Sequence, residues 1–269
     1  MASHIVPNRP VIVTVHLPPD PDEETYMIRL RACSLAIVLG LAACHSPSPA
    51  RAKAVAPKTF DTPEAAITHY VTSVAAGDLD VALEATAAEE MSARYDFPAV
   101  ARYVPAMDPL NLQAPTRYEM YVRLNKMILT AQGAAATKMF VYALLADMNL
   151  EQPVMSATEA QISRFVTAVD PARLKALKVV RVDKTKEARN EKPELAALNK
   201  KHAAFNGADD QTERLALYQL GDRYYWSGFQ LLRYGNRWAI SGFNSLMTRM
   251  KGVGVEKTTP ADYDALLKG

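Results

Sequence analysis

The chain has 269 residues, of which 49% are hydrophobic, and its 31 lysines and arginines against 29 aspartates and glutamates leave a formal net charge of +2. This small excess of basic residues, which are not gathered in one block, gives no electrostatic case for nucleic-acid binding. Both cysteines, Cys33 and Cys44, lie near the N-terminus, so the chain beyond Cys44 has no disulfide framework and an ordered domain there must depend on its hydrophobic core.

The stretch 27–44 has the parts of a secretory signal. Arg29 and Arg31 precede an apolar run at 35–41, and this run is too short to cross a bilayer as a permanent helix. Small residues then lead to Cys44. The pattern predicts that the chain is exported, and a buried helix or a cleaved signal without lipid are the alternatives.

The end of this stretch, Leu41-Ala42-Ala43-Cys44, resembles the lipobox of bacterial lipoproteins. The resemblance implies that Cys44 becomes the first residue of the mature chain and carries diacylglycerol together with an amide-linked acyl chain such as palmitate. Several acyl chains give stable attachment, whereas a single chain binds a membrane only marginally. We therefore expect a lipoprotein of the cell envelope whose partner through Cys44 is the membrane, in a Gram-negative source the outer membrane facing the periplasm.

Residues 1–26 fit poorly in front of such a signal. Acidic side chains stand where a signal peptide is normally basic, at Asp20, Asp22, Glu23 and Glu24. Prolines at positions 18, 19 and 21 would separate this segment from any domain. We therefore predict that translation starts at Met27 and that residues 1–26 are either untranslated or disordered.

Order is predicted to begin after a flexible tether. Residues 45–58 are rich in Pro, Ala and Ser and have little apolar surface to bury. Thr62-Pro63 then predicts a helix, because threonine is a good N-cap and proline fits the first turn. Apolar residues at helical spacing continue as far as Gly77, which is typical of a helix end, and Asp78 would cap a second, short helix.

Four strands are predicted in the second half of the chain. Valines favour a strand at 178–184, and three more strands follow in meander order at 214–220, 224–234 and 237–246. Gly221-Asp222 and Gly235-Asn236 are the expected turns. The segment 187–205 is rich in Glu, Lys and Ala, which predicts a charged surface helix.

Two segments resemble the nuclear-transport-factor-2-like superfamily. The run Phe60-Asp-Thr-Pro-Glu-Ala-Ala-Ile, followed by Gly77-Asp78-Leu-Asp, is similar to its opening helices, and Leu231-Leu-Arg-Tyr-Gly-Asn-Arg-Trp238-Ala-Ile is similar to its closing hairpin. The resemblance implies a cone of two or three helices against a strongly curved antiparallel sheet, of the ketosteroid-isomerase type, which serves both enzymes and plain binding modules. We therefore predict one α+β domain over residues 59–250 and a C-terminal tail over 251–269.

Residues 97–177 exceed what this superfamily explains, and they predict a helical insertion that packs on the cone or closes its mouth. Helices are expected at 116–129 and at 137–148, the second buried, although 139–142 alone could be a strand. Ser156 and Glu159 form an expected capping box for a helix as far as Val169, and Asp170-Pro171 would start another as far as Leu177.

Catalytic residues are not identified by the sequence. His45, His69 and His202 do not have the spacing of metal ligands, and no phosphate-binding loop, serine elbow or cysteine nucleophile is present. Enzymes of the superfamily place a Tyr or a His with an Asp inside the cone, and no such pair can be carried over to residues of this chain. We therefore predict no catalytic residue, no metal and no cofactor, and a non-catalytic role is favoured.

Aromatic residues of the expected third strand form the candidate ligand surface, because ligand pockets are mainly apolar with a few polar groups. Strand alternation places Tyr224 and Trp226 on one face of the sheet and Tyr225 and Phe229 on the other. Packing in the core is the default alternative for all four side chains. Trp238 is assigned to the core.

The sequence thus predicts a membrane-anchored binding or envelope-maintenance module whose further partner is a small apolar ligand or an envelope protein. The contrasting hypothesis is a small-molecule isomerase or dehydratase in the same cone. A buried carboxylate near a Tyr or His in an open pocket would favour the enzyme, and a cone filled by apolar side chains would favour the binding module. A homodimer formed through an exposed apolar sheet face is a third hypothesis.

Overall fold

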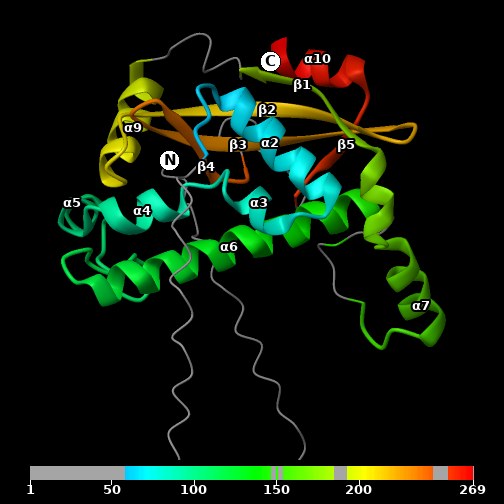
Figure 1. Ribbon diagram of the computed structural model, residues 1–269, viewed down its shortest axis with the longest axis horizontal. Helices are drawn as coiled ribbons and strands as arrows, with labels where there is room; N and C mark the ends of the chain where they lie inside the picture. The colour runs from blue at the N-terminus through cyan, green and yellow to red at the C-terminus, as the bar shows by residue number, and fades with distance from the viewer. Residues whose placement is uncertain (1–57, 147–149, 151–153, 185–192, 245–253, 269) are drawn as a thin grey trace, which may run out of the picture. The chain divides into compact units, whose positions relative to one another are not determined.

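A computed structural model describes residues 58–146, 150, 154–184, 193–244 and 254–268 (Figure 1). By its internal contacts the chain divides into two units, residues 1–54 and 55–269, and all described residues belong to the second. The predicted N-terminal extension, the signal stretch with Cys44, and all of the tether except Lys58 lie outside the described residues.

A five-stranded antiparallel sheet forms the centre of the described unit (Figure 1). Four strands lie in sequence order, and they are β1 (Leu177–Lys184), β2 (Asp210–Leu220), β3 (Arg223–Tyr234) and β4 (Arg237–Gly242). The short β5 (Glu256–Thr258) pairs with residues 224–226 of β3, whereas β4 pairs with residues 230–234 of the same strand. Irregular register within β1 and between β3 and β4 bends the sheet. The predicted meander and both predicted glycine turns are therefore present.

Helix α2 (Pro63–Ala76) begins and ends where the sequence predicts. The Thr62 hydroxyl accepts a hydrogen bond from the backbone N–H of Ala65 at 3.1 Å, and Gly77 ends the helix with a φ of +79°. Asp78 in turn caps α3 (Leu79–Leu83) by accepting from the N–H of Val81 at 3.2 Å. These boundaries form locally, because each depends on side chains next to the helix end.

Helix α6 (Glu119–Leu145) is a single helix of 27 residues, where the sequence predicts two helices. The expected break near Gly133 is helical, and so is 139–142, the run that could have been a strand. Gly133 is buried, and a Cβ atom there would lie 3.2 Å from the Leu83 side chain. The glycine therefore serves a close approach of α6 to α3, and tertiary packing outweighs its low helix propensity.

The rest of the insertion and the segment before it differ from prediction in their details. Two short helices are not predicted by the sequence, α4 (Ala88–Arg94) before the insertion and α5 (Phe97–Tyr103) at its start. Helix α7 (Glu159–Ala168) is capped by the pair Thr158 and Gln161, two residues later than the predicted box. Asp170 caps a 3-10 helix, η1 (Pro171–Ala176), through the N–H of Ala172 at 2.9 Å, as its predicted capping role requires.

The C-terminal residues belong to the fold, whereas the sequence predicts a tail after residue 250. Strand β5 pairs with β3, and α10 (Pro260–Lys268) buries Tyr263 and Leu267 against the sheet. The pattern is hard to read in the sequence because only these two side chains, four residues apart, define the buried face of a very short helix.

Both faces of the sheet are covered, as the alternation of aromatic residues in β3 predicts. The main core lies between the sheet and helices α2 and α6. On the other face, α10 packs against Leu215, Leu217 and Trp226, while α9 (Pro193–Phe205) contributes Ala203 to a cluster with Leu232 and Tyr234. The sheet therefore has helices on both sides.

Candidate functional site

The space between the sheet and the two long helices is filled by aromatic rings. Tyr70 of α2 contacts the rings of Phe140 and Phe229 edge to face, with centroids 6.0 and 6.1 Å away, and Phe243 at 5.1 Å. Phe140 of α6 meets Tyr218 of β2 at 5.5 Å and nearly at a right angle. These five side chains pack against one another between the sheet and the two helices.

Two buried tyrosine hydroxyls in this interior are paired with other hydroxyls. Tyr70 donates to Thr137 Oγ1 at 3.0 Å, and Tyr218 lies 2.8 Å from Ser227 Oγ. Burial raises the pKa of both tyrosines, so both phenols stay protonated at physiological pH. Among the described residues, neither hydroxyl is hydrogen-bonded to a carboxylate or an imidazole, the partners that acid–base chemistry would use.

The predicted ligand residues are divided between two cores. Tyr225 and Phe229 belong to the main core, whereas Trp226 and the half-buried Tyr224 lie on the opposite face with Tyr263 of α10. The structure therefore brings them together in two pairs, one on each face of the sheet. Their role in ligand binding stays a prediction. Trp238 packs against the main core, as assigned.

The described histidines lie apart from one another on α2 and α9. His69 Nδ1 lies 3.3 Å from Lys58 Nζ, and burial together with the Lys58 charge lowers the pKa of this imidazole. Burial likewise lowers the pKa of His202, which lies beside Phe205. No group of three or more His, Cys, Asp or Glu side chains that could hold a metal occurs in the part of the chain that the structure describes.

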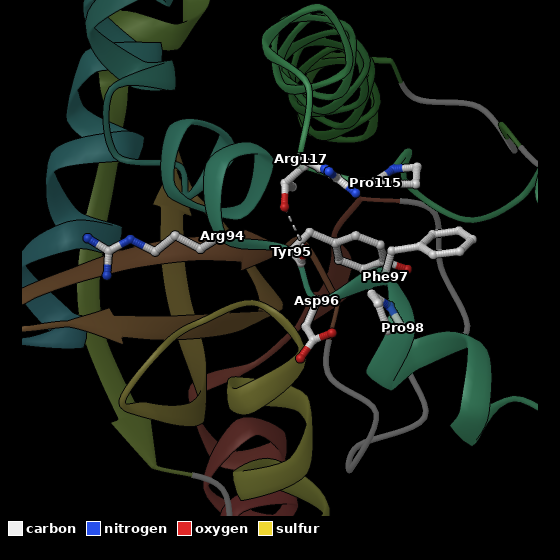
Figure 2. A pocket seen from close by; sticks show the side chains of 8 residues that line it. Arg94, Tyr95, Asp96, Phe97, Pro98, Pro115 and Arg117 are labelled. Carbon is white, nitrogen blue, oxygen red and sulfur yellow. Dashed lines mark hydrogen bonds between the residues drawn. The ribbon is translucent and has the colours of Figure 1, made fainter.

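An open groove of about 640 Å³ lies at the corner between α4 and α5 (Figure 2). Its walls come from two segments, with Arg94, Tyr95, Asp96, Phe97 and Pro98 in one and Pro115, Thr116 and Arg117 in the other. Figure 2 shows the rings of Tyr95 and Phe97 extending to the same side, toward Pro115, while Arg94 extends the opposite way. The guanidinium of Arg94 lies 5.3 Å from the centre of the Tyr234 ring.

The first wall of the groove is fixed by Asp96. Its side chain accepts from the backbone N–H of Ala99 at 2.9 Å and so begins α5. Its own N–H donates to the carbonyl of Phe205 at 2.9 Å, which ties the corner to the end of α9. The wall is therefore held by one hydrogen bond to the Asp96 side chain and one between backbone groups.

Asn125 of α6 fixes the second wall. Its buried amide accepts from the N–H of Ala114 and donates to the carbonyl of the same residue, both at 2.8 Å. The hydroxyl of Thr116 then joins the two walls by donating to the carbonyl of Tyr95 at 3.1 Å. The groove is thus preorganised by a clamp between segments about twenty residues apart.

The surfaces in the groove suit binding. Burial raises the pKa of Tyr95, against the opposing effect of a hydrogen bond with the backbone of Gln113, so the phenol is neutral at physiological pH. Gln113 Oε1 is buried without a hydrogen-bond partner among the described residues. Phe97 is half-buried, and Arg117 is exposed at the rim. The groove presents flat apolar walls with a cation at one edge.

Sequence reasoning did not find this groove. One local signal was available, because Asp96-Phe97-Pro98 repeats the arrangement of a capping side chain followed by an early proline that marks α2. The second wall carries no such signal, since it depends on the contact between Asn125 and Ala114.

Comparison with known proteins bears on the fold. No protein-family model matches the sequence, and no curated protein matches it. Among solved structures, a cystatin-like protein from Ruminococcus gnavus is similar, with a TM-score of 0.50 and 19% identity over 72% of this chain and 44% of that one. The chain thus spans less than half the length of that protein. The likeness confirms the predicted α+β fold of helices on a curved antiparallel sheet, since cystatin-like folds are related to the nuclear-transport-factor-2-like fold.

Proposed function

We propose that the chain is a lipid-anchored, non-catalytic binding module of the cell envelope, attached through Cys44 and carrying its ligand site outside the core. The lipobox-like Leu41-Ala42-Ala43-Cys44 supports the anchor. The observation that carries the binding role is the filled interior, where Tyr70, Phe140 and Tyr218 occupy the space that a catalytic cone would leave open.

The alternative of an isomerase or dehydratase receives less support. Such an enzyme needs a base and an acid facing a substrate cavity, and the tyrosine hydroxyls of the interior face Thr137 and Ser227 instead. Because rings fill the interior, a ligand site is expected on the surface of the domain. The groove at Tyr95 has a volume in the usual range for small ligands.

The groove favours a ligand with a flat apolar group and a negative charge. Tyr95, Phe97 and the two prolines Pro98 and Pro115 would contact the apolar group. Arg117 can reach a carboxylate or phosphate of the ligand, for which a guanidinium is well suited. A small metabolite and an extended segment of an envelope protein both meet this description.

Metabolic labelling tests the anchor. The full chain is expressed in a bacterium that matures lipoproteins, with an alkyne-tagged palmitate in the medium. We expect label on the wild type and on Cys33→Ser, and none on Cys44→Ser, which should also leave the membrane fraction. Labelling of Cys44→Ser at the wild-type level, or a mature N-terminus before residue 44, would show that the anchor is misassigned.

Native mass spectrometry of protein purified from the envelope fraction tests the groove. Phe97→Ala and Arg117→Ala should each weaken the affinity for a co-purified ligand about tenfold, the effect of losing one good contact, and so lower its occupancy. Arg102→Ala, an exposed arginine of α5 outside the groove, should not change it. Turnover of the co-purified molecule by the protein would instead support the enzyme hypothesis.

A further inference from the structure

Helix α6 has a second apolar face that nothing in the described structure covers. Along its outer side lie Met120, Leu124, Met127 and Ile128, which are 65, 45, 69 and 46% exposed, followed by the exposed Ala131 and Ala135. Apart from the adjacent Met127 and Ile128, successive members are three or four residues apart, so the six form one stripe along the helix, the outer face of α6. Figure 1 shows α6 at the border of the described unit, with the sheet on its other side.

The concentration of exposed apolar side chains in this part of the chain is high. All of the large exposed hydrophobic residues of the described chain except Leu79 and Val180 lie between residues 103 and 166. At the C-terminal end of the helix, Tyr142 contacts Phe165 of α7, and α7 itself exposes Ile162 and Val166. Apolar surface of this extent on a folded domain marks an interaction site.

Helix α6 does not span a membrane in this fold, although its length and composition would allow it. Phe140, Leu144 and Leu145 from its C-terminal half are buried in the main core. Spanning would remove these side chains from the sheet, whereas a helix that lies in the membrane interface keeps them there and inserts only its outer face.

The charged residues beside the outer face of α6 indicate what kind of partner this face binds. Arg123, Lys126 and Lys138 are the basic residues of the helix, and Glu119 in its first turn is its only acidic residue. Lys126 is paired with Glu89 of α4, so Arg123 and Lys138 are the cations of the helix that carry the argument. Arg117 precedes the helix. A second copy of the same face would bring these cations together, which costs energy, whereas an anionic lipid surface attracts each of them.

We propose that the outer face of α6 lies on a membrane surface that contains anionic lipid, with Met120, Leu124 and Met127 inserted among the acyl chains and the basic residues at the headgroups. Thirteen residues lie between Cys44 and Lys58, so an extended tether of at most about 50 Å lets the domain turn this face to the bilayer. The proposal rests on the proposed lipid anchor in one respect, because the anchor is what keeps the domain near the membrane. The outer face of α6 itself should bind lipid whether or not the anchor is present.

The test therefore uses the full chain without the lipid. In a Cys33→Ser, Cys44→Ser background, an environment-sensitive dye is attached at Met127→Cys, and vesicles of phosphatidylcholine are compared with vesicles of equal parts phosphatidylcholine and phosphatidylglycerol. We expect a blue shift only with the anionic vesicles, which is reversed by salt. The same dye at Ala265→Cys, on α10 across the sheet, should not shift.

Matched substitutions distinguish this surface from the apolar stretch 27–44, which is present in every variant. Leu124→Ser with Met127→Ser should weaken vesicle binding roughly tenfold or more, because two partly inserted side chains are lost. The control pair Leu79→Ser with Val180→Ser, which removes exposed apolar side chains elsewhere, should have no effect. Thermal unfolding checks that both double variants remain folded.

Three outcomes would overturn the proposal: no dye shift at position 127, equal vesicle binding by both double variants, or a dimer in analytical ultracentrifugation that Met127→Ser dissociates. The last outcome would assign the outer face of α6 to a second copy of the chain. None of these results depends on whether Cys44 is lipidated, so the anchor and the surface can fail separately.

Discussion

The hydroxyl of Tyr218 lies 2.8 Å from Ser227 Oγ across the ladder between β2 and β3, and both side chains are buried. Each hydroxyl is the hydrogen-bond partner of the other, and aromatic rings surround the pair. A polar pair of this kind can be kept in a core because neither group is left without a partner.

Removal of one member of this pair should destabilise the protein. Ser227→Ala leaves the Tyr218 hydroxyl buried without its partner, and we expect a loss of about 1–3 kcal/mol in the free energy of unfolding. Tyr218→Phe together with Ser227→Ala should cost less than the two single changes summed, because no orphan hydroxyl remains. Urea unfolding of the four proteins in the cycle measures the coupling, and strictly additive losses would contradict the pairing.

Arg237 should contribute more to stability than an exposed charged residue. Its buried guanidinium pairs with Glu90 and donates to the carbonyl of Glu84 at 2.7 Å and, through Nε, to that of Lys58 at 3.1 Å. Arg237→Met leaves these acceptors unpaired, for an expected loss of about 3–5 kcal/mol. Lys126→Met, which breaks the exposed pair with Glu89, should cost less than about 1 kcal/mol. Equal losses in chemical denaturation would refute this difference.

Gly254 should not tolerate a side chain. Its φ is +85°, and a Cβ atom there would lie 2.8 Å from the carbonyl oxygen of Met139 in α6. Gly254→Ala therefore adds backbone strain of about 1–2 kcal/mol to a steric overlap of about 1–3 kcal/mol. Gly221→Ala is the matched control, because that glycine has a φ of +64° and open space around it. If thermal unfolding shows equal losses, the close approach to α6 is not significant.

His69 gives the stability a dependence on pH. Its pKa is lowered in the folded state by burial and by the Lys58 ammonium, so the unfolded chain takes up the proton first as the pH falls. The contribution of neutral His69 to the free energy of unfolding is therefore at its full value above the ordinary histidine pKa of about 6.5. It declines as the pH drops below that value. His69→Gln should reduce this decline in urea titrations. Lys58→Gln should raise the pKa of His69 in an NMR titration, and an unchanged pKa would contradict the contact.

The features that sequence reasoning predicted are those decided by neighbouring residues. Thr62, Pro63 and Gly77 fix the limits of α2 through local hydrogen bonds and backbone preferences. The strands of the meander have the alternation and turns that pairing requires, and the structure places Tyr225 and Trp226 on opposite faces accordingly. Such signals do not depend on the rest of the fold.

The features that it missed depend on distant contacts. Gly133 is typical of a helix break until Leu83 is known to lie against it. The groove forms because Asn125 holds the backbone of Ala114 beside the corner at Tyr95, and no periodicity in either segment records that contact. The short helix α10 was missed for a related reason, since its two buried side chains find their partners on strands far away in sequence.

The pairing of β3 has a consequence for biosynthesis. One edge of β3 pairs with β4 along residues 230–234 and with β5 along residues 224–226, and α10 covers Trp226. Because β5 and α10 emerge from the ribosome after β1 to β4, the nascent domain carries an open edge beside an exposed tryptophan until they arrive. A product truncated before residue 256 would keep that edge, and it would be prone to aggregate and a natural substrate for chaperones and proteases.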